Sequence, residues 1–154
     1  MKANWKIITN VKITVFDLDG NITDVQEFKN LITTVGLGMI IDLLDGGIAD
    51  GEIKRMALGS SNTAPALTDI KLGNETFRKA MTTQTQPTTN SLVSTVYVSP
   101  SENAVQIEEI GWFAGVNADD TPDNGILVSR ILYSRLKTTL ESIQVERTDT
   151  ITEA

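Results

Sequence analysis

Residues 11–28 read VKITVFDLDGNITDVQEF, and this stretch decides how the chain begins to fold. Apolar side chains alternate with polar ones over 11–15 until Phe16 breaks the pattern, which predicts a β-strand. Asp19 and Gly20 follow, and an Asp-Gly pair supplies the positive φ that tight hairpin turns demand. Residues 22–28 can then run back antiparallel, so we predict an N-terminal β-hairpin.

The turn of this hairpin also resembles the opening motif of the haloacid dehalogenase superfamily, in which an apolar strand ends in Asp-x-Asp-Gly-Thr. The resemblance implies a magnesium-dependent phosphatase in which Asp17 attacks phosphorus and Asp19 handles the proton of the leaving group. Asn21 stands where the motif has Thr. The stretch is therefore either an aspartate nucleophile loop or a simple turn.

Composition limits the chemistry that the chain can perform. It has 154 residues, enough for one domain with its own core, and we expect a single domain over 1–154. A net charge of −7 argues against a nucleic-acid partner, because phosphate contacts need clustered Lys and Arg. Without Cys or His, the chain lacks thiolate chemistry and the commonest general base and metal ligand. We expect no catalytic residue, no cofactor and no metal site.

One helix is expected after the hairpin, over residues 31–44. The apolar side of this helix consists of Ile32, Val35, Met39 and Leu43. We expect these residues to be buried against a sheet together with Ile110, Trp112 and Leu132. Gly46 and Gly47 are expected to end the helix, as glycines do at helix C-termini.

Most of the remaining sequence is typical of strands. One is predicted over 53–59, and four more are predicted over 92–98, 105–113, 126–136 and 140–146, between turn-rich segments. Residues 82–90 are rich in Thr and are expected to form an exposed loop. Consecutive strands favour antiparallel pairing, so we predict a mainly β (α+β) fold, an antiparallel β-sandwich-like domain with one packed helix and the N-terminal hairpin. Within it we distinguish a hairpin arm (1–28), a β-rich body with the helix (29–147) and a polar C-terminal tail (148–154).

This layout weighs against the phosphatase. A haloacid dehalogenase domain needs a parallel sheet whose strands alternate with crossover helices, whereas only one helix is predicted here. Glu108 and Glu109 do not form a catalytic pair either, because neighbours on a strand point to opposite faces and at least one of them is expected to be solvated. The phosphatase using Asp17 is kept only as a remote alternative.

Three blocks of the sequence are similar to small tail and baseplate proteins of tailed bacteriophages. The first is NLITTVGL at 30–37, closed by DLLDGG; the second is IKRMALGSSNTAP at 53–65, with TD at 68–69 and ETFR at 75–78; the third is IEEIGWF at 107–113, followed by GILVSRILYS. The same order of blocks resembles the N-terminal attachment domain of phage tail-collar fibre proteins. The chain departs from the pattern at Ser61, often Gly in the family, and in an acidic insertion over 116–124.

The resemblance implies a non-enzymatic structural subunit of a virion, assembled in the host cytoplasm and most consistent with a tail, baseplate or fibre-attachment component. A capsid decoration or collar protein is the alternative within this class. The implied partners are other virion proteins and further copies of the chain. No apolar run approaches the roughly 20 residues that cross a bilayer, so no membrane partner is expected.

The hairpin arm is the predicted contact with a neighbouring subunit. An isolated two-stranded hairpin is barely stable in water, so its apolar side chains must be covered by the domain or by another chain. The predicted interaction residues are Val11, Ile13, Val15, Phe16, Ile22, Val25 and Phe28.

Overall fold

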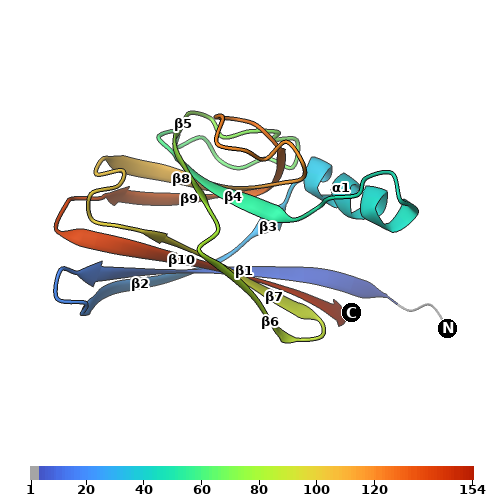
Figure 1. The fold of residues 1–154 in the computed structure, drawn as a ribbon, viewed down its shortest axis with the longest axis horizontal. Coiled ribbons are helices and arrows are strands. Elements are labelled where there is room, and N and C mark those ends of the chain that lie inside the picture. The colour runs from blue at the N-terminus through green and yellow to red at the C-terminus, as the bar shows by residue number, and fades with distance from the viewer. Residues whose placement is uncertain (1–3) are drawn as a thin grey trace.

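The computed structural model describes residues 4–154 as two five-stranded antiparallel sheets that lie face to face (Figure 1). Sheet A contains, in spatial order, β2 (Ile22–Lys29), β1 (Trp5–Asp17), β10 (Glu141–Glu153), β7 (Ser91–Val98) and β6 (Thr83–Thr88). Sheet B contains β3 (Leu31–Ile32), β9 (Ile126–Leu136), β8 (Gln106–Ala114), β4 (Ile53–Gly59) and β5 (Glu75–Ala80). With 55% of residues in strands and 8% in helix, the predicted mainly β sandwich-like fold is confirmed.

The N-terminal hairpin is part of sheet A. Every residue of β1 pairs with β10, from Trp5 opposite Glu153 to Asp17 opposite Glu141, and β2 lies on the other side of β1. The described part of the hairpin is therefore a part of sheet A and does not project as an arm, and residues 148–153 belong to β10 and not to a separate tail. Apart from Ile151, residues 148–153 are polar, in a part of the strand that is only half covered, and they still pair fully along the backbone.

Residues 82–90 also differ from the expected loop. They contain β6, which pairs with β7 and forms one edge of sheet A, with Gln84 alone half-buried among its side chains. Pro87 lies in this edge strand, where a missing backbone N–H is tolerated and discourages pairing with a further strand.

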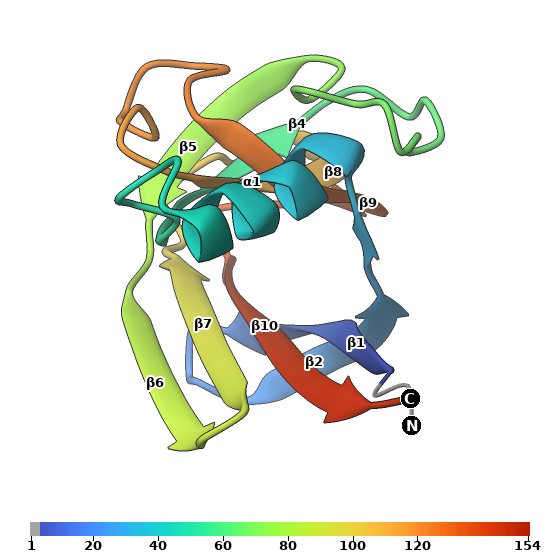
Figure 2. The ribbon, with the colours of Figure 1, turned by 90° about the vertical axis from the view of Figure 1, so that its right-hand side faces the viewer.

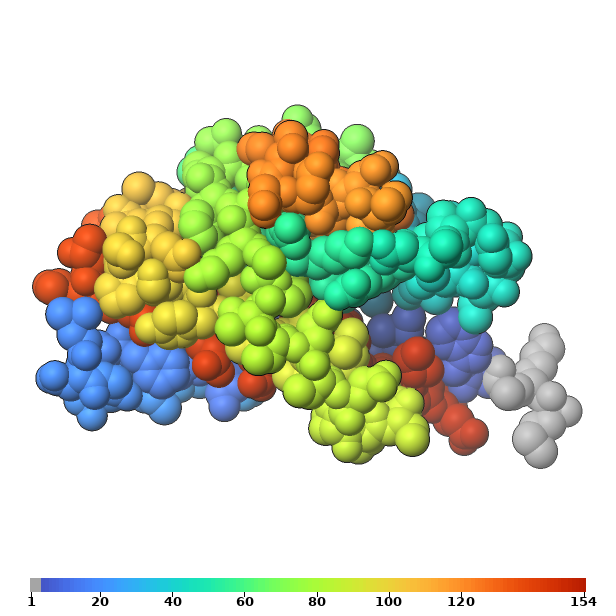
Figure 3. Space-filling view, in the orientation of Figure 1, coloured from blue at the N-terminus to red at the C-terminus, as the bar shows by residue number. Residues whose placement is uncertain are grey.

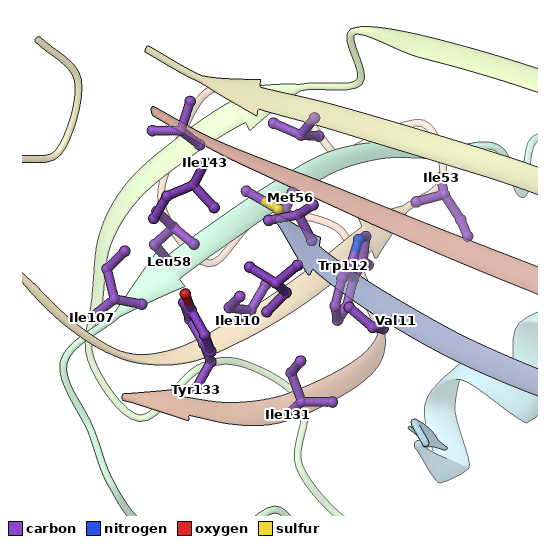
Figure 4. Packing of buried hydrophobic residues seen from close by; sticks show 14 of the residues in the cluster. Val11, Ile53, Met56, Leu58, Ile107, Ile110, Trp112, Ile131, Tyr133 and Ile143 are labelled. Carbon is purple, nitrogen blue, oxygen red and sulfur yellow. The ribbon is translucent and has the colours of Figure 1, made fainter. Parts of the chain in front are cut away.

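The core lies between the two sheets. Val11, Ile13 and Val15 of β1 point inward and meet Ile110 and Trp112 of β8, all at 1% exposure or less. Figure 4 shows this cluster, to which both sheets contribute side chains. Ile110 and Trp112 are buried as predicted. Leu132 is only half-buried, because its neighbours Ile131 and Tyr133 take the inward positions of β9 and alternation turns Leu132 the other way.

The helix α1 (Thr34–Asp45) begins three residues later than expected. Leu31 and Ile32 instead form β3 against Ser129 and Arg130 of β9. Thr33 then caps the helix, because its Oγ1 accepts a hydrogen bond of 3.0 Å from the backbone N–H of Gly36. The predicted glycine stop is correct, since Gly46 has the left-handed conformation (φ 79°) that ends a helix.

The predicted packing side of α1 is correct in part. Met39 is buried as predicted and Ile32 packs partly buried against the core, whereas Val35 and Leu43 are exposed at 38% and 39%. Gly36, which was not predicted, is also buried. The helix approaches β9 so closely at Gly36 that a Cβ there would lie 2.7 Å from the carbonyl oxygen of Val128. This close approach leaves no room for a side chain at position 36.

The two glycines of α1 provide a matched test of this packing. Gly36→Ala is expected to lower the free energy of unfolding by about 1–3 kcal/mol, because the new methyl group would clash with backbone atoms. Gly38→Ala is expected to raise it by about 0.5–1 kcal/mol, since a Cβ at Gly38 meets nothing within 4 Å and alanine favours the helix. Urea unfolding of both variants measures the difference, and equal effects would contradict the close contact with β9.

Candidate assembly interface

The acidic motif at 17–21 forms the turn of the hairpin. The carboxylate of Asp17 accepts hydrogen bonds from the backbone N–H groups of Asn21 (2.8 Å) and Asp19 (3.0 Å) and from Nδ2 of Asn21 (3.1 Å). These hydrogen bonds, the one from the Asn21 backbone first, hold the pKa of Asp17 below its ordinary value. Gly20 takes the positive φ of 83° that the turn requires. The carboxylate of Asp17 thus closes a turn, and the two sheets contain antiparallel pairings rather than the parallel sheet that a haloacid dehalogenase needs.

The seven predicted interaction residues of the hairpin divide into three groups. Val11, Ile13 and Val15 are at most 1% exposed and belong to the core of the chain itself. Phe16 and Phe28 are half-buried, and the ring of Phe28 meets the ring of Tyr133 edge-on at 6.0 Å between centroids. Ile22 and Val25 are 62% and 45% exposed on the edge strand β2. Of the seven, Ile22 and Val25 therefore offer the most surface to a partner.

A buried carboxylate that the sequence did not reveal organises sheet B. Glu109 is completely buried on β8. Its two oxygens accept hydrogen bonds from the backbone N–H groups of Asn74 (2.8 Å), Gly73 (2.9 Å) and Ser61 (3.2 Å). Nε of Arg130 on β9 completes the set at 2.6 Å. Glu109 thereby fixes both ends of the long loop between β4 and β5 to the strands beneath it.

Arg130 extends this network into the middle of the same loop. Its Nη1 donates to Asp69 at 3.0 Å and its Nη2 donates to the carbonyl oxygen of Thr63 at 2.7 Å. Glu109 and Arg130 lie within strands that are otherwise largely apolar. This pattern is the signal that could have identified the network, since a buried charge needs a partner.

A second buried ion pair holds the acidic segment 116–124. Arg78 donates to both oxygens of Glu75 at 2.6 and 2.9 Å, and the two side chains are only 3% and 2% exposed. The guanidinium of Arg78 also lies over the ring of Phe113, 4.2 Å from its centroid, and donates to the carbonyl oxygens of Asp119 and Asn124. The insertion is therefore anchored by its backbone to β5, through Arg78 and Glu75.

One group of exposed apolar side chains lies around α1, at one end of the sandwich. Figure 2 looks at this end, with α1 lying across it, and Figure 3 shows the helix protruding there. We call this surface the α1 patch; its members are Trp5 (54% exposed), Leu31 (50%), Leu37 (47%), Ile41 (57%), Leu44 (72%) and Leu67 (49%). All of these except Leu44 line one groove of about 450 Å³ between the helix and the start of β1.

A second groove, of about 460 Å³, lies on the other side of α1, with Met39, Leu43 and Ile53 in its wall. Arg147 contributes to this groove but is itself only 1% exposed. Its guanidinium donates to Asp149 at 2.8 and 2.9 Å and to Ser129, and it lies 5.4 Å from the centroid of the Trp112 ring. The positive charge of Arg147 in this groove is therefore already paired within the chain.

Neither a metal site nor a membrane-spanning helix is found among residues 4–154. The described residues contain no group of three or more Asp and Glu side chains arranged to hold a metal ion. None of the helices found among them has the length and apolar character needed to cross a membrane.

Comparison of the chain with protein-family models, with curated proteins and with solved structures finds no match.

Glu109 and its neighbour Glu108 give a matched test of the buried network. Glu109→Gln is expected to lower the free energy of unfolding by about 3–5 kcal/mol, because it leaves the buried guanidinium of Arg130 without its closest charge partner. Glu108→Gln is expected to change it by less than about 0.5 kcal/mol, since this half-buried side chain contacts Gln106 and retains an acceptor as glutamine. Similar losses for both variants in chemical denaturation would refute the proposed role of Glu109.

Proposed function

We propose that the chain is a non-enzymatic structural subunit of a tailed-bacteriophage virion, a tail, baseplate or fibre-attachment component that acts through protein–protein assembly. The observation that carries this proposal is the α1 patch, with six large apolar side chains between 47% and 72% exposed at one end of the molecule. Apolar surface gathered in this way marks an interaction site more often than a free surface.

The shape of the patch supports a protein partner. The groove along α1 is lined by Trp5, Leu31, Leu37, Ile41 and Leu67, and the polar residues among its walls are Lys6 and Asn30. A large aromatic and several aliphatic side chains around a shallow groove are the composition found at the centre of protein interfaces. Ile22 and Val25 on the edge strand β2 form a smaller second apolar surface at which a further subunit can pack.

The polar residues of the phage-like blocks serve the architecture of the domain. Asp69, Glu109, Glu75 and Arg78 fix loops to sheet B through paired hydrogen bonds. Because these polar groups are already hydrogen-bonded within the domain, the contacts with neighbouring subunits are left to the exposed apolar side chains of the α1 patch. This division agrees with what the resemblance to tail and baseplate proteins implies.

Incorporation into particles tests the proposal. Purified particles from cells that produce the phage are expected to contain the wild-type chain, and a cryo-electron microscopy map is expected to place it in the tail or baseplate. Absence of the chain from these particles would reject the proposal, and density on the capsid or collar would favour that alternative.

A pair of variants then tests the role of the α1 patch in assembly. Ile41→Asp is expected to reduce incorporation at least tenfold, because it puts a charge in the middle of the patch. Val116→Asp is the control, since Val116 is 77% exposed and lies outside the patch. Both variants should show the circular dichroism and melting of the wild type; equal incorporation of both would show that the patch is not the contact used.

The remote phosphatase alternative has its own test. Asp17→Asn is expected to leave the hydrolysis of a generic aryl phosphate with magnesium unchanged at background level, and to shift the melting temperature only slightly, because asparagine keeps an oxygen for the turn. The lowered pKa of Asp17 implies that the stabilisation by its charge is present above its ordinary pKa of 3.8 and is lost as the pH falls through the lower folded value. Magnesium-dependent turnover that disappears in the variant would overturn the proposed structural role.

A further inference from the structure

We infer that the α1 patch binds a second copy of this chain, with the two α1 helices packed antiparallel across a twofold axis. This inference rests on the proposed function in treating the patch as an assembly surface, and it goes further by naming the partner and its orientation.

The outward stripe of α1 has the spacing of a helix–helix contact. Leu37, Ile41 and Leu44 follow one another at intervals of four and three residues, so they share one face of the helix. The face that packs on β9 is a different one, formed by Gly36 and Met39. α1 therefore has apolar residues for two contacts, one of which is satisfied within the chain.

The charges of α1 are reversed relative to those that stabilise an isolated helix. The first turn has no acidic residue and the last turn has no basic residue, while Asp42 and Asp45 lie near the C-terminus. The C-terminus of a helix carries a partial negative charge and the N-terminus a partial positive charge. Both aspartates are thus in an unfavourable position in a lone chain.

An antiparallel pair of helices relieves this conflict, which is why we name a second copy as the partner. In such a pair the C-terminal end of each helix lies beside the N-terminal end of the other, so each Asp45 approaches a positive helix end. A parallel pair would instead bring the aspartates of both copies together. Lys6, the charged residue in the wall of the adjacent groove in the described chain, adds positive charge on the same surface.

The two aspartates are neighbours on the helix surface, but they differ in their distance from the stripe. Asp45 lies four residues after Ile41 and therefore borders the stripe. Asp42 lies four residues after Gly38 and seven after Val35, farther round the helix from the stripe than Asp45. The antiparallel arrangement thus predicts that Asp45 contributes to the contact and that Asp42 does not.

The two α1 helices alone are too short to bury the area of a standard protein–protein interface. A helix of 12 residues is about 18 Å long, whereas a standard interface covers about 800 Å² on each side. The two helices alone cover only part of that area. Trp5, Leu31 and Leu67, which border the same groove, must therefore join the interface.

Sedimentation equilibrium of the purified full chain tests self-association. The wild type is expected to dimerise with increasing concentration, Ile41→Asp to remain monomeric, and Val116→Asp to dimerise like the wild type. A wild type that stays monomeric at every concentration, or an Ile41→Asp variant that dimerises normally, would overturn the inference.

The orientation is tested by Asp45→Asn and Asp42→Asn, which change the net charge by the same amount. Asparagine at 45 also keeps an oxygen for the hydrogen bond that Asp45 accepts from the N–H of Gly47 at 2.7 Å. Because Asp45→Asn removes a charge–dipole attraction from each half of the symmetric dimer, it is expected to weaken the dimer about threefold to thirtyfold, while Asp42→Asn leaves it unchanged. Equal effects of the two variants would refute the antiparallel packing.

Failure of the proposed dimer and failure of the proposed virion role give different experimental results. A wild-type chain that is monomeric in solution yet is incorporated into particles through the α1 patch refutes the dimer and leaves the structural role intact. A dimer that forms as described, in a chain absent from the particles, supports the inference and rejects the virion assignment.

Discussion

The structure depends first on the pairing of β1 with β10. These strands come from opposite ends of the described chain, and they pair over the full length of both, from Trp5 with Glu153 to Asp17 with Glu141. They lie in the middle of sheet A, so β2 attaches to one side and β7 to the other. The inward residues of β1 then supply one wall of the core. Because the contact joins segments far apart in sequence, its loop-closure entropy must be overcome before the rest of sheet A can form.

The loop that covers sheet B is held in place by a buried ion pair. The buried pair of Glu109 and Arg130 ties the loop between β4 and β5 to strands β8 and β9 through backbone N–H groups and a carbonyl oxygen. A buried ion pair contributes little net stability, since desolvation offsets much of the attraction. Its effect here is positional, because a polar loop of more than ten residues is given one conformation over the sheet. Leu67, the member of the α1 patch that this loop contributes, is thereby held in place.

Local patterns in the sequence predicted the fold class because most strands carry their own signals. The alternation over 11–15, the Asp-Gly turn and the glycines after α1 are each determined by neighbouring residues. The extension of β1 back to Trp5 and of β10 forward to Glu153 was not predictable in this way, because each polar half-strand is stabilised by the other. Likewise, Glu109 looked like half of a solvated pair, since nothing adjacent in sequence shows that Arg130 and three backbone N–H groups surround it. The start of α1 depended on Thr33, which β9 also holds through hydrogen bonds from the Thr33 Oγ1 to the Leu127 and Val128 carbonyl oxygens.

The surface residues of α1 show where local preferences and the isolated fold disagree. In a sequence that specifies one structure, propensity, polarity and charge placement favour the same conformation. Along α1 they conflict, since Gly38 lowers helix propensity without any close neighbour, the acidic residues lie at the negative end of the helix, and Leu37, Ile41 and Leu44 face outward. The buried charges of sheet B, by contrast, are all paired within the chain. α1 therefore presents apolar side chains and helix-end charges that have no partner within its own helix, on the surface where we propose that a second copy binds.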